Sequence, residues 1–167
     1  TYPLSEAQTD RFMLKELVHY PSITDEIEVI DRMDAGRYDR DRHPAPVVSL
    51  DDVRRVQEIV RSVHLDRALV AYASRLVAVT REPAQHLPSN LARLIEYGAS
   101  PRATIAFCRS ARALAVIHDR GHVVPEDISM LAHRVLRHRL ILGFEAASAR
   151  ITPDAVVDAV LQTVPVP

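Results

Sequence analysis

Helix-start signals recur from Ser49 to the end of the chain. Most combine a side chain that can accept a hydrogen bond from the first helical turn with a proline or an acidic residue just after it. The expected starts lie near Ser49, Asp66, Ser100, Val124 and Thr152. A chain of 167 residues has the length of about one domain. The sequence therefore predicts a mainly α fold, in which residues 49–167 form a helical bundle.

Apolar residues three or four positions apart predict which face of each helix is buried. Hydrophobic residues make up 47% of the chain and aromatic residues only 5%, so aliphatic side chains must supply most of the core. The residues expected to face it are Val53, Val56, Val60, Val63, Leu69, Ala73, Leu76, Val77, Ile105, Cys108, Ala111, Leu114, Ala115, Ile128, Leu131, Val135, Leu136, Val156, Val157, Val160 and Leu161.

The part of the chain before Ser49 carries weaker signals. Residues 1–11 are polar and predict a loop, whereas the alternation of apolar and polar residues over 12–18 predicts a strand. Such a strand needs partners for its N–H and C=O groups. We therefore expect it to be disordered, packed on the helical part, or paired with another copy of the chain.

A helix and a linker are expected next. Ser22 is a candidate N-cap, and Asp25 and Glu26 favour the positive end of a helix dipole. The charged stretch that follows contains Gly36 and two prolines, which are typical of a linker. The expected division is thus residues 1–20, a connecting helix and linker at 21–48, and the bundle at 49–167.

Charge and composition exclude several classes of function. The 21 basic and 22 acidic residues nearly balance, which argues against a polybasic nucleic-acid-binding surface. No apolar run approaches the length of about 20 residues that a membrane span needs. Cys108 is the only cysteine, so no disulfide can form within the chain, which suits a reducing cytoplasm. A cytoplasmic location is therefore expected.

The only lysine, Lys15, excludes one nucleotide-binding motif. A P-loop requires lysine between glycine and serine or threonine, but Lys15 lies between Leu14 and Glu16. We therefore expect the chain by itself neither to hold ATP in that manner nor to hydrolyse it.

Residue spacing also bears on two further features, the histidine pairs and a basic cluster late in the chain. The pairs His118/His122 and His133/His138 have no acidic or cysteine residue at zinc-site spacing, so no metal is expected. The basic run at 135–140 is explained by the negative end of a helix dipole, with phosphate contact as the alternative.

The segment GASPRA, residues 98–103, is a more specific candidate site. Gly98 allows a tight turn, Ser100 is an N-cap, and Pro101 occupies the first helical position. Arg102 then lies in the first turn, where a positive charge opposes the helix dipole. An anion held by free backbone N–H groups and the guanidinium would remove that conflict. The alternative is a solvated arginine with a small energetic cost.

A second candidate is Arg11, in the segment EAQTDRF at 6–12. It precedes the expected strand, so it is either an ordinary surface residue or an arginine presented at a subunit edge to a neighbour's phosphate.

In this order, these motifs resemble the lid-bearing half of a MoxR-type AAA+ ATPase. The resemblance covers nearly the whole chain and is weakest over 34–48. The matching stretches are TYPLSEAQTDRF at 1–12, LVAVTR at 76–81, YGASPRATIAFCRSARALA at 97–115, HVVPEDISMLAHRVLRHRLIL at 122–142 and ITPDAVVDAVLQTVPVP at 151–167.

The resemblance implies roles for these residues. Residues 1–20 correspond to the end of an α/β nucleotide-binding core, whose Walker motifs and sensor 1 are not in this sequence. Arg102, supported by Ser100 and Pro101, falls on the sensor 2 arginine that reaches ATP from the lid. Arg11 falls on an arginine finger that acts on the neighbouring subunit. Ser5 and Thr9 depart from the family's expected Pro and Leu.

The family also implies cofactors and partners. A full-length protein is expected to use ATP and Mg²⁺, neither held by this part alone, and to form a ring, expected to be a hexamer. MoxR proteins, named after a methanol dehydrogenase regulator, are chaperone-like and work with client enzymes and with proteins that carry von Willebrand factor A-type domains. The alternative is a non-enzymatic helical interaction module related to magnesium chelatase or helicase-loader lids. A P-loop motif in the upstream sequence would decide between them.

Overall fold

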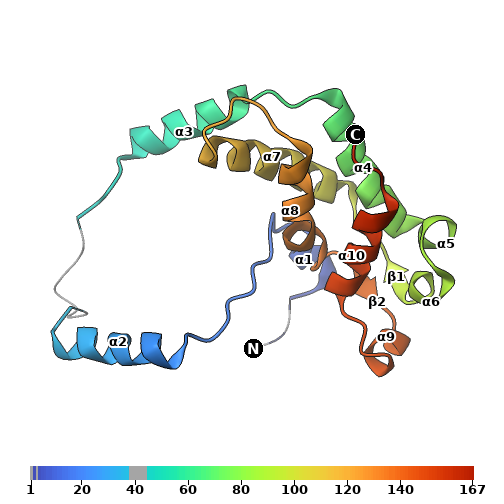
Figure 1. Ribbon diagram of the computed structural model, residues 1–167, viewed down its shortest axis with the longest axis horizontal. Helices are drawn as coiled ribbons and strands as arrows, with labels where there is room; N and C mark the ends of the chain where they lie inside the picture. Colours follow the sequence, from blue (N-terminus) through green and yellow to red (C-terminus); the bar gives the residue numbers. More distant parts are fainter. Residues whose placement is uncertain (1, 3, 38–44) are drawn as a thin grey trace. The chain divides into compact units, whose positions relative to one another are not determined.

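The computed structural model describes residues 2, 4–37 and 45–167, and it is mainly helical (Figure 1). Part of the expected linker, residues 38–44, lies outside the described residues. The chain divides into two compact units. The larger unit contains residues 1–15 and 58–167, and the smaller contains residues 16–57.

Four helices form the core of the larger unit. They are α4 (Arg67–Arg81), α7 (Pro101–Ile117), α8 (Pro125–Leu136) and α10 (Pro153–Thr163). Helices α7 and α10 each pack against both α4 and α8 (Figure 1). The largest side chains buried completely or almost completely between them include Tyr72, Leu76, Phe107, Ile128 and Leu136. The predicted helical bundle is therefore confirmed.

The predicted helix starts are confirmed, and four of the five have a capping side chain, the exception being Val124. Asp66 accepts a hydrogen bond from the Ala68 N–H at 2.7 Å. Thr152 accepts one from the Ala155 N–H at 3.3 Å. Ser49, just before α3 (Leu50–Ser62), and Asp52, in the first turn of α3, bond reciprocally, as in a capping box.

The buried face of α7 includes Ala111 and Ala115 as predicted, but it differs from the prediction near the start of the helix. Ile105, predicted to be in the core, is 52% exposed, whereas Ala103 and Ala106 are buried. Alanines lie inward because α7 is enclosed by both α4 and α8, and small side chains allow close packing. Sequence spacing had favoured the larger aliphatic residue.

The burial of helix α3 also differs from the prediction. Val53 and Val56 are 44% and 51% exposed, although their spacing predicted burial. Val63, just after the helix, is buried in the core. Helical spacing identifies an apolar face, but it does not say what covers that face.

Several short elements were not predicted at all. They are α1 (Glu6–Thr9), α5 (Pro83–His86), α6 (Ser89–Ala92), β1 (Ile95–Tyr97), β2 (Ile141–Leu142) and α9 (Phe144–Ser148). Strands β1 and β2 pair antiparallel, with Ile95 opposite Leu142 and Tyr97 opposite Ile141. These two strands depend on pairing between distant segments, which local patterns do not report.

The predicted strand at 12–18 is wrong, because these residues have no regular secondary structure. Alternation alone cannot form a strand, and no described strand pairs with this run. Leu14 packs against the core, and the Lys15 N–H donates to the Arg134 carbonyl oxygen at 2.9 Å. Of the three expectations for this segment, packing on the helical part holds for its first residues, up to Lys15.

The loop predicted at 1–11 contains the short helix α1. Ser5 stands at its N-cap, and the Ser5 N–H donates to Gln8 Oε1 at 2.9 Å. The serine that departs from the family pattern therefore has a local structural use.

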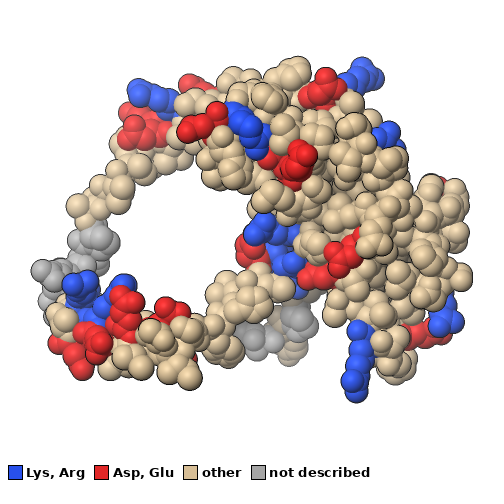
Figure 2. Space-filling view, viewed as in Figure 1, with Lys and Arg blue, Asp and Glu red and all other residues tan. Residues whose placement is uncertain are grey.

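The smaller unit contains α2 (Ile23–Asp34) and the beginning of α3. Ser22 caps α2 as predicted, and its hydroxyl donates to Asp25 at 2.7 Å, which lowers the pKa of that carboxyl. Basic and acidic side chains both lie on the surface of α2 (Figure 2), where Arg32 pairs with Glu28.

Gly98 is required for close packing and not for a tight turn. A Cβ atom at this position would lie 2.2 Å from the Thr80 carbonyl oxygen and 2.6 Å from the Arg81 nitrogen. These are backbone atoms, which cannot rotate away. The end of α4 therefore contacts the chain immediately before α7.

We expect Gly98→Ala to lower the free energy of unfolding by about 1–3 kcal/mol, because the backbone must shift to admit the methyl group. Urea denaturation measures the change. Gly121→Ala is the matched control, since nothing lies within 4 Å of a Cβ there. Equal stability losses in both variants would contradict the close-packing explanation.

Candidate functional site

The start of α7 is built as the sequence predicted, with Ser100 as N-cap and Pro101 as the first helical residue. The Arg102 N–H donates to Ser100 Oγ at 3.2 Å, and the Ala103 N–H donates to the Ser100 carbonyl oxygen at 2.9 Å. The first N–H groups of this helix are therefore engaged. Any anion here is held by side chains, and the expected free N–H groups next to Arg102 are not found.

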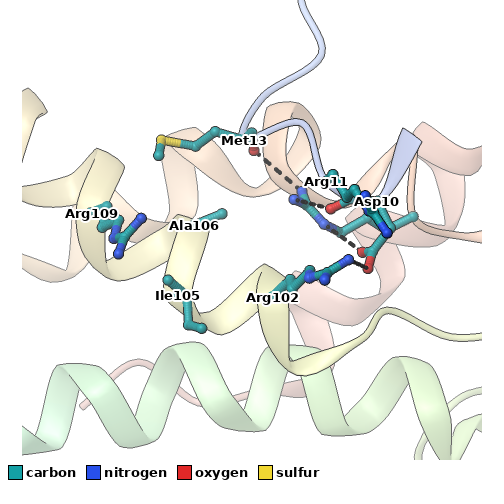
Figure 3. Close-up of a pocket in the computed structure, with 8 residues that line it drawn as sticks. Asp10, Arg11, Met13, Arg102, Ile105, Ala106 and Arg109 are labelled. Atoms are coloured by element: carbon teal, nitrogen blue, oxygen red, sulfur yellow. Dashed lines mark hydrogen bonds and ion pairs between the residues drawn. The ribbon is translucent and has the colours of Figure 1, made fainter. Parts of the chain in front are cut away.

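An anion already occupies this position, and it is the carboxylate of Asp10 (Figure 3). Ser100 Oγ lies 3.0 Å and 2.9 Å from the two carboxylate oxygens of Asp10 and donates its proton to them. Arg102 Nη1 lies 3.6 Å from Asp10 Oδ2, and Arg139 Nε lies 3.1 Å from Asp10 Oδ1. The conflict between Arg102 and the helix dipole is thus relieved from within the chain.

Arg139 holds the Asp10 segment in place. Its side chain is 2% exposed and lies just after α8. Each of its N–H groups has an acceptor: besides Asp10 Oδ1, these are the carbonyl oxygens of Asp10, Phe12, Met13 and Val135. Burial lowers the pKa of Arg139 from its ordinary value, and the Asp10 carboxylate counteracts this effect. Five protein acceptors therefore take the place of water around the Arg139 guanidinium.

The contacts of Arg139 also bear on the basic run at 135–140. Arg139 donates to the Val135 carbonyl oxygen in the last turn of α8, which agrees with the helix-dipole explanation. Its remaining donors bind residues 10–13, a role that no local rule indicated.

Beside this network lies a cleft of about 260 Å³. Its lining residues are Asp10, Arg11, Met13, Arg102, Ile105, Ala106, Arg109 and Arg139. Arg102 and Arg109 project from one side of α7, and the segment from Asp10 to Met13 lies opposite (Figure 3).

The cleft carries an excess of positive charge, since its lining has four guanidinium groups and one carboxylate. Arg139 is fully bonded, but Arg102 is 54% exposed and only loosely paired with Asp10. Arg11 and Arg109 are exposed, and neither side chain has a partner among the described residues. Chemically, the cleft can accept a multiply charged anion.

The structure thus brings the predicted residues Arg11, Ser100, Pro101 and Arg102 to one place. Sequence reasoning missed Asp10 and Arg109. The adjacent Arg11 was the available signal for Asp10. For Arg109, the signal was its position seven residues after Arg102, which places both arginines on one face of the helix.

The histidines make other contacts. His133 Nε2 lies 2.9 Å from Asp158 Oδ1, and His138 Nε2 lies 3.1 Å from the Phe12 carbonyl oxygen. Burial lowers the pKa of His138, which favours its neutral form. Within the described ranges, no three His, Cys, Asp or Glu residues lie close enough together to hold a metal ion.

Comparisons with known proteins agree with this fold. The AAA lid domain family matches residues 88–160. The chaperone MoxR1 of Mycobacterium tuberculosis is 40% identical over 166 residues, covering 99% of this chain and 43% of that protein. YeaC, an uncharacterized protein of Bacillus subtilis, is 36% identical over 171 residues, covering 100% of this chain and 49% of that protein.

A solved structure is also similar. The crystal structure of a candidate ATPase from Cytophaga hutchinsonii aligns with a TM-score of 0.90 and 36% identity, covering 99% of this chain and 50% of that one. The fold and the family match define the lid of an AAA+ protein. The chain belongs to the MoxR family of AAA+ ATPases, of which it carries the lid region.

The chain spans about half the length of the curated relatives it matches. None of the helices in the described ranges has the length and apolar character needed to cross a bilayer.

Proposed function

We propose that this chain is the lid of an ATP-hydrolysing ring protein, and that Arg102 senses the phosphates of ATP from the start of α7. The observation that supports this proposal is the cleft itself, where Arg102 is half-exposed and only loosely paired. A phosphoryl-transfer site works mainly by positioning and by neutralising charge. An arginine on a mobile lid can therefore bind phosphate when the lid closes and release it when phosphate leaves.

The other parts of the site follow from the family. A nucleotide-binding core in the full-length protein would hold ATP and Mg²⁺ and supply the P-loop that this sequence lacks. Arg11 would act as an arginine finger on the neighbouring subunit of a ring, proposed to be a hexamer. The exposed, unpaired side chain of Arg11 is compatible with that use.

For the biological role, we propose a cytoplasmic chaperone-like ATPase that couples ATP hydrolysis to the maturation of partner enzyme complexes. Proteins with von Willebrand factor A-type domains and client enzymes, such as a methanol dehydrogenase-like complex, are the proposed partners. No nucleic-acid or membrane partner is proposed. Relatives named MoxR1, a chaperone, and MoxR, from Methylorubrum extorquens, support this assignment.

Arg102→Ala in the full-length protein tests the sensor role. Charge-assisted contacts contribute about 1.5–3 kcal/mol, so nucleotide affinity or turnover should fall roughly ten- to a hundredfold. The melting temperature should barely change, because the side chain is 54% exposed. Nucleotide titration and a thermal melt on the same preparation measure both quantities.

Arg93→Ala is the matched control, because Arg93 is 69% exposed and does not line the cleft. It should leave affinity and turnover unchanged. A folded Arg102→Ala protein with normal affinity and turnover would contradict the sensor role, and a full-length protein without ATP hydrolysis would contradict the proposed function.

A further inference from the structure

Asp10 makes three kinds of contact that differ in strength. Its hydrogen bonds to Ser100 and Arg139 are 2.9–3.1 Å long, whereas its ion pair with Arg102 spans 3.6 Å. Arg139 is 2% exposed and Arg102 is 54% exposed. The first two, which we call the sheltered contacts, are partly buried, whereas the third faces the open cleft.

The sheltered contacts fix Arg11 relative to α7. Arg11 directly follows Asp10, and Arg139 also binds the carbonyl oxygens of Phe12 and Met13 on its other side. Releasing the segment would leave a buried guanidinium without its acceptors, which is strongly unfavourable. The backbone at Arg11 therefore moves together with the start of α7, which carries Arg102.

The exposed contact is easily exchanged. A loosely paired, exposed ion pair contributes little to stability. A phosphate chain carries more negative charge than one carboxylate and offers several oxygens to the same guanidinium, so it forms shorter and stronger bonds. Arg102 can leave Asp10 for phosphate without disturbing Ser100 or Arg139.

We propose that Asp10 is a positioning residue that competes with phosphate for Arg102 while it keeps Arg11 fixed to the start of α7. This inference rests on the proposed role of Arg102 as a phosphate ligand. When phosphate leaves, the Asp10 carboxylate recaptures Arg102, which favours release of the anion. Arg11, held by the sheltered bonds, follows the lid in both states.

The test is a double-mutant cycle on the 167-residue chain, with tripolyphosphate as the probe. Asp10→Asn keeps an acceptor for Arg139 and removes the competing charge. Binding of tripolyphosphate should become about three- to tenfold tighter, because Arg102 no longer has to give up its ion pair with Asp10. In an Arg102→Ala background, the same substitution should change affinity less than twofold.

Asp154→Asn is the matched control, because Asp154 also pairs with an arginine after α8, Arg137, but does not line the cleft. It removes the same charge and should leave affinity within twofold. A purely structural role for Asp10 predicts weaker binding with or without Arg102. That result, equal tightening in the control, or no binding by any variant would overturn the proposal.

A measurement on the unaltered chain covers the case in which Asp10→Asn fails to fold. Nuclear magnetic resonance of the arginine Nε–H groups should show the Arg102 signal shifting as tripolyphosphate is added, while the Arg139 signal stays in place. Equal movement of both signals would overturn the proposal. ATP turnover by the full-length protein tests the proposed function separately, since its absence would leave the exchange at Asp10 intact.

Discussion

Arg139→Met should lower the free energy of unfolding of this chain by about 2–4 kcal/mol. Methionine matches the length of the arginine stem but donates no hydrogen bonds. The five acceptors of Arg139 would then have to find water or remain unpaired, including the carboxylate of Asp10. Urea denaturation at neutral pH, fitted with a common slope, gives the difference.

Arg109→Met is the matched control for this substitution. It makes the same chemical change on an exposed arginine whose side chain has no partner among the described residues. We expect a change within about 0.5 kcal/mol. If both variants lose the same stability, the loss comes from net charge, and the network around Arg139 does not anchor residues 10–13.

The sequence predicted the helices of the larger unit because their signals are local. Asp66 and Thr152 each cap a helix within three residues of themselves, and such bonds need no tertiary partner. Residues 128, 131, 135 and 136 were likewise placed correctly in the core, since one helix face carries them all.

The cleft was predicted only in part, because its decisive contacts join distant segments. Ser100 and Arg102 could be recognised from a local cap and an unfavourable dipole. Asp10 is separated from Ser100 by 90 residues and from Arg139 by 129, and no periodicity reports such a pairing. The sequence left two alternatives at Arg102, a bound anion or a solvated side chain, and it did not show that the chain itself supplies the anion.

The strand predicted at 12–18 fails for a related reason. Alternation describes the two faces of a strand but does not guarantee a partner strand. Within residues 12–15, the side chain of Arg139 and the carbonyl oxygen of Arg134 take the place of a partner strand. Side-chain donors therefore bind the backbone of this segment where a sheet would otherwise do so.

Asp127→Ala should have a comparably large effect at the opposite end of α8. The carboxylate of Asp127 is 2% exposed and binds Arg120 through two contacts, of 2.8 Å and 2.5 Å. It also accepts the Val124 N–H at 2.9 Å, which caps the helix. Losing the cap and the charge-assisted bonds should cost about 2–4 kcal/mol of unfolding free energy at pH 7, measured by urea denaturation.

This effect should depend on pH in a defined direction. Burial alone would raise the pKa of Asp127, but the bonds from Arg120 and Val124 outweigh it and hold the pKa below its ordinary value of 3.8. The stabilisation is therefore fully present above the pKa of the unfolded chain and is lost as pH falls through the lower folded value. The difference in free energy of unfolding between the parent chain and Asp127→Ala should stay constant from pH 5 to 7 and become smaller below about pH 4.

Asp158→Ala provides the control, because Asp158 is 59% exposed and, among the residues that the structure describes, pairs only with His133. Its loss should change stability by less than about 1 kcal/mol. If the Asp127→Ala difference were as large at pH 3 as at pH 7, the ionised carboxylate would not be its source, and side-chain packing would have to explain the loss. A difference that narrows with acid would instead show that α8, whose far end is followed by Arg139, is anchored at its start by charge.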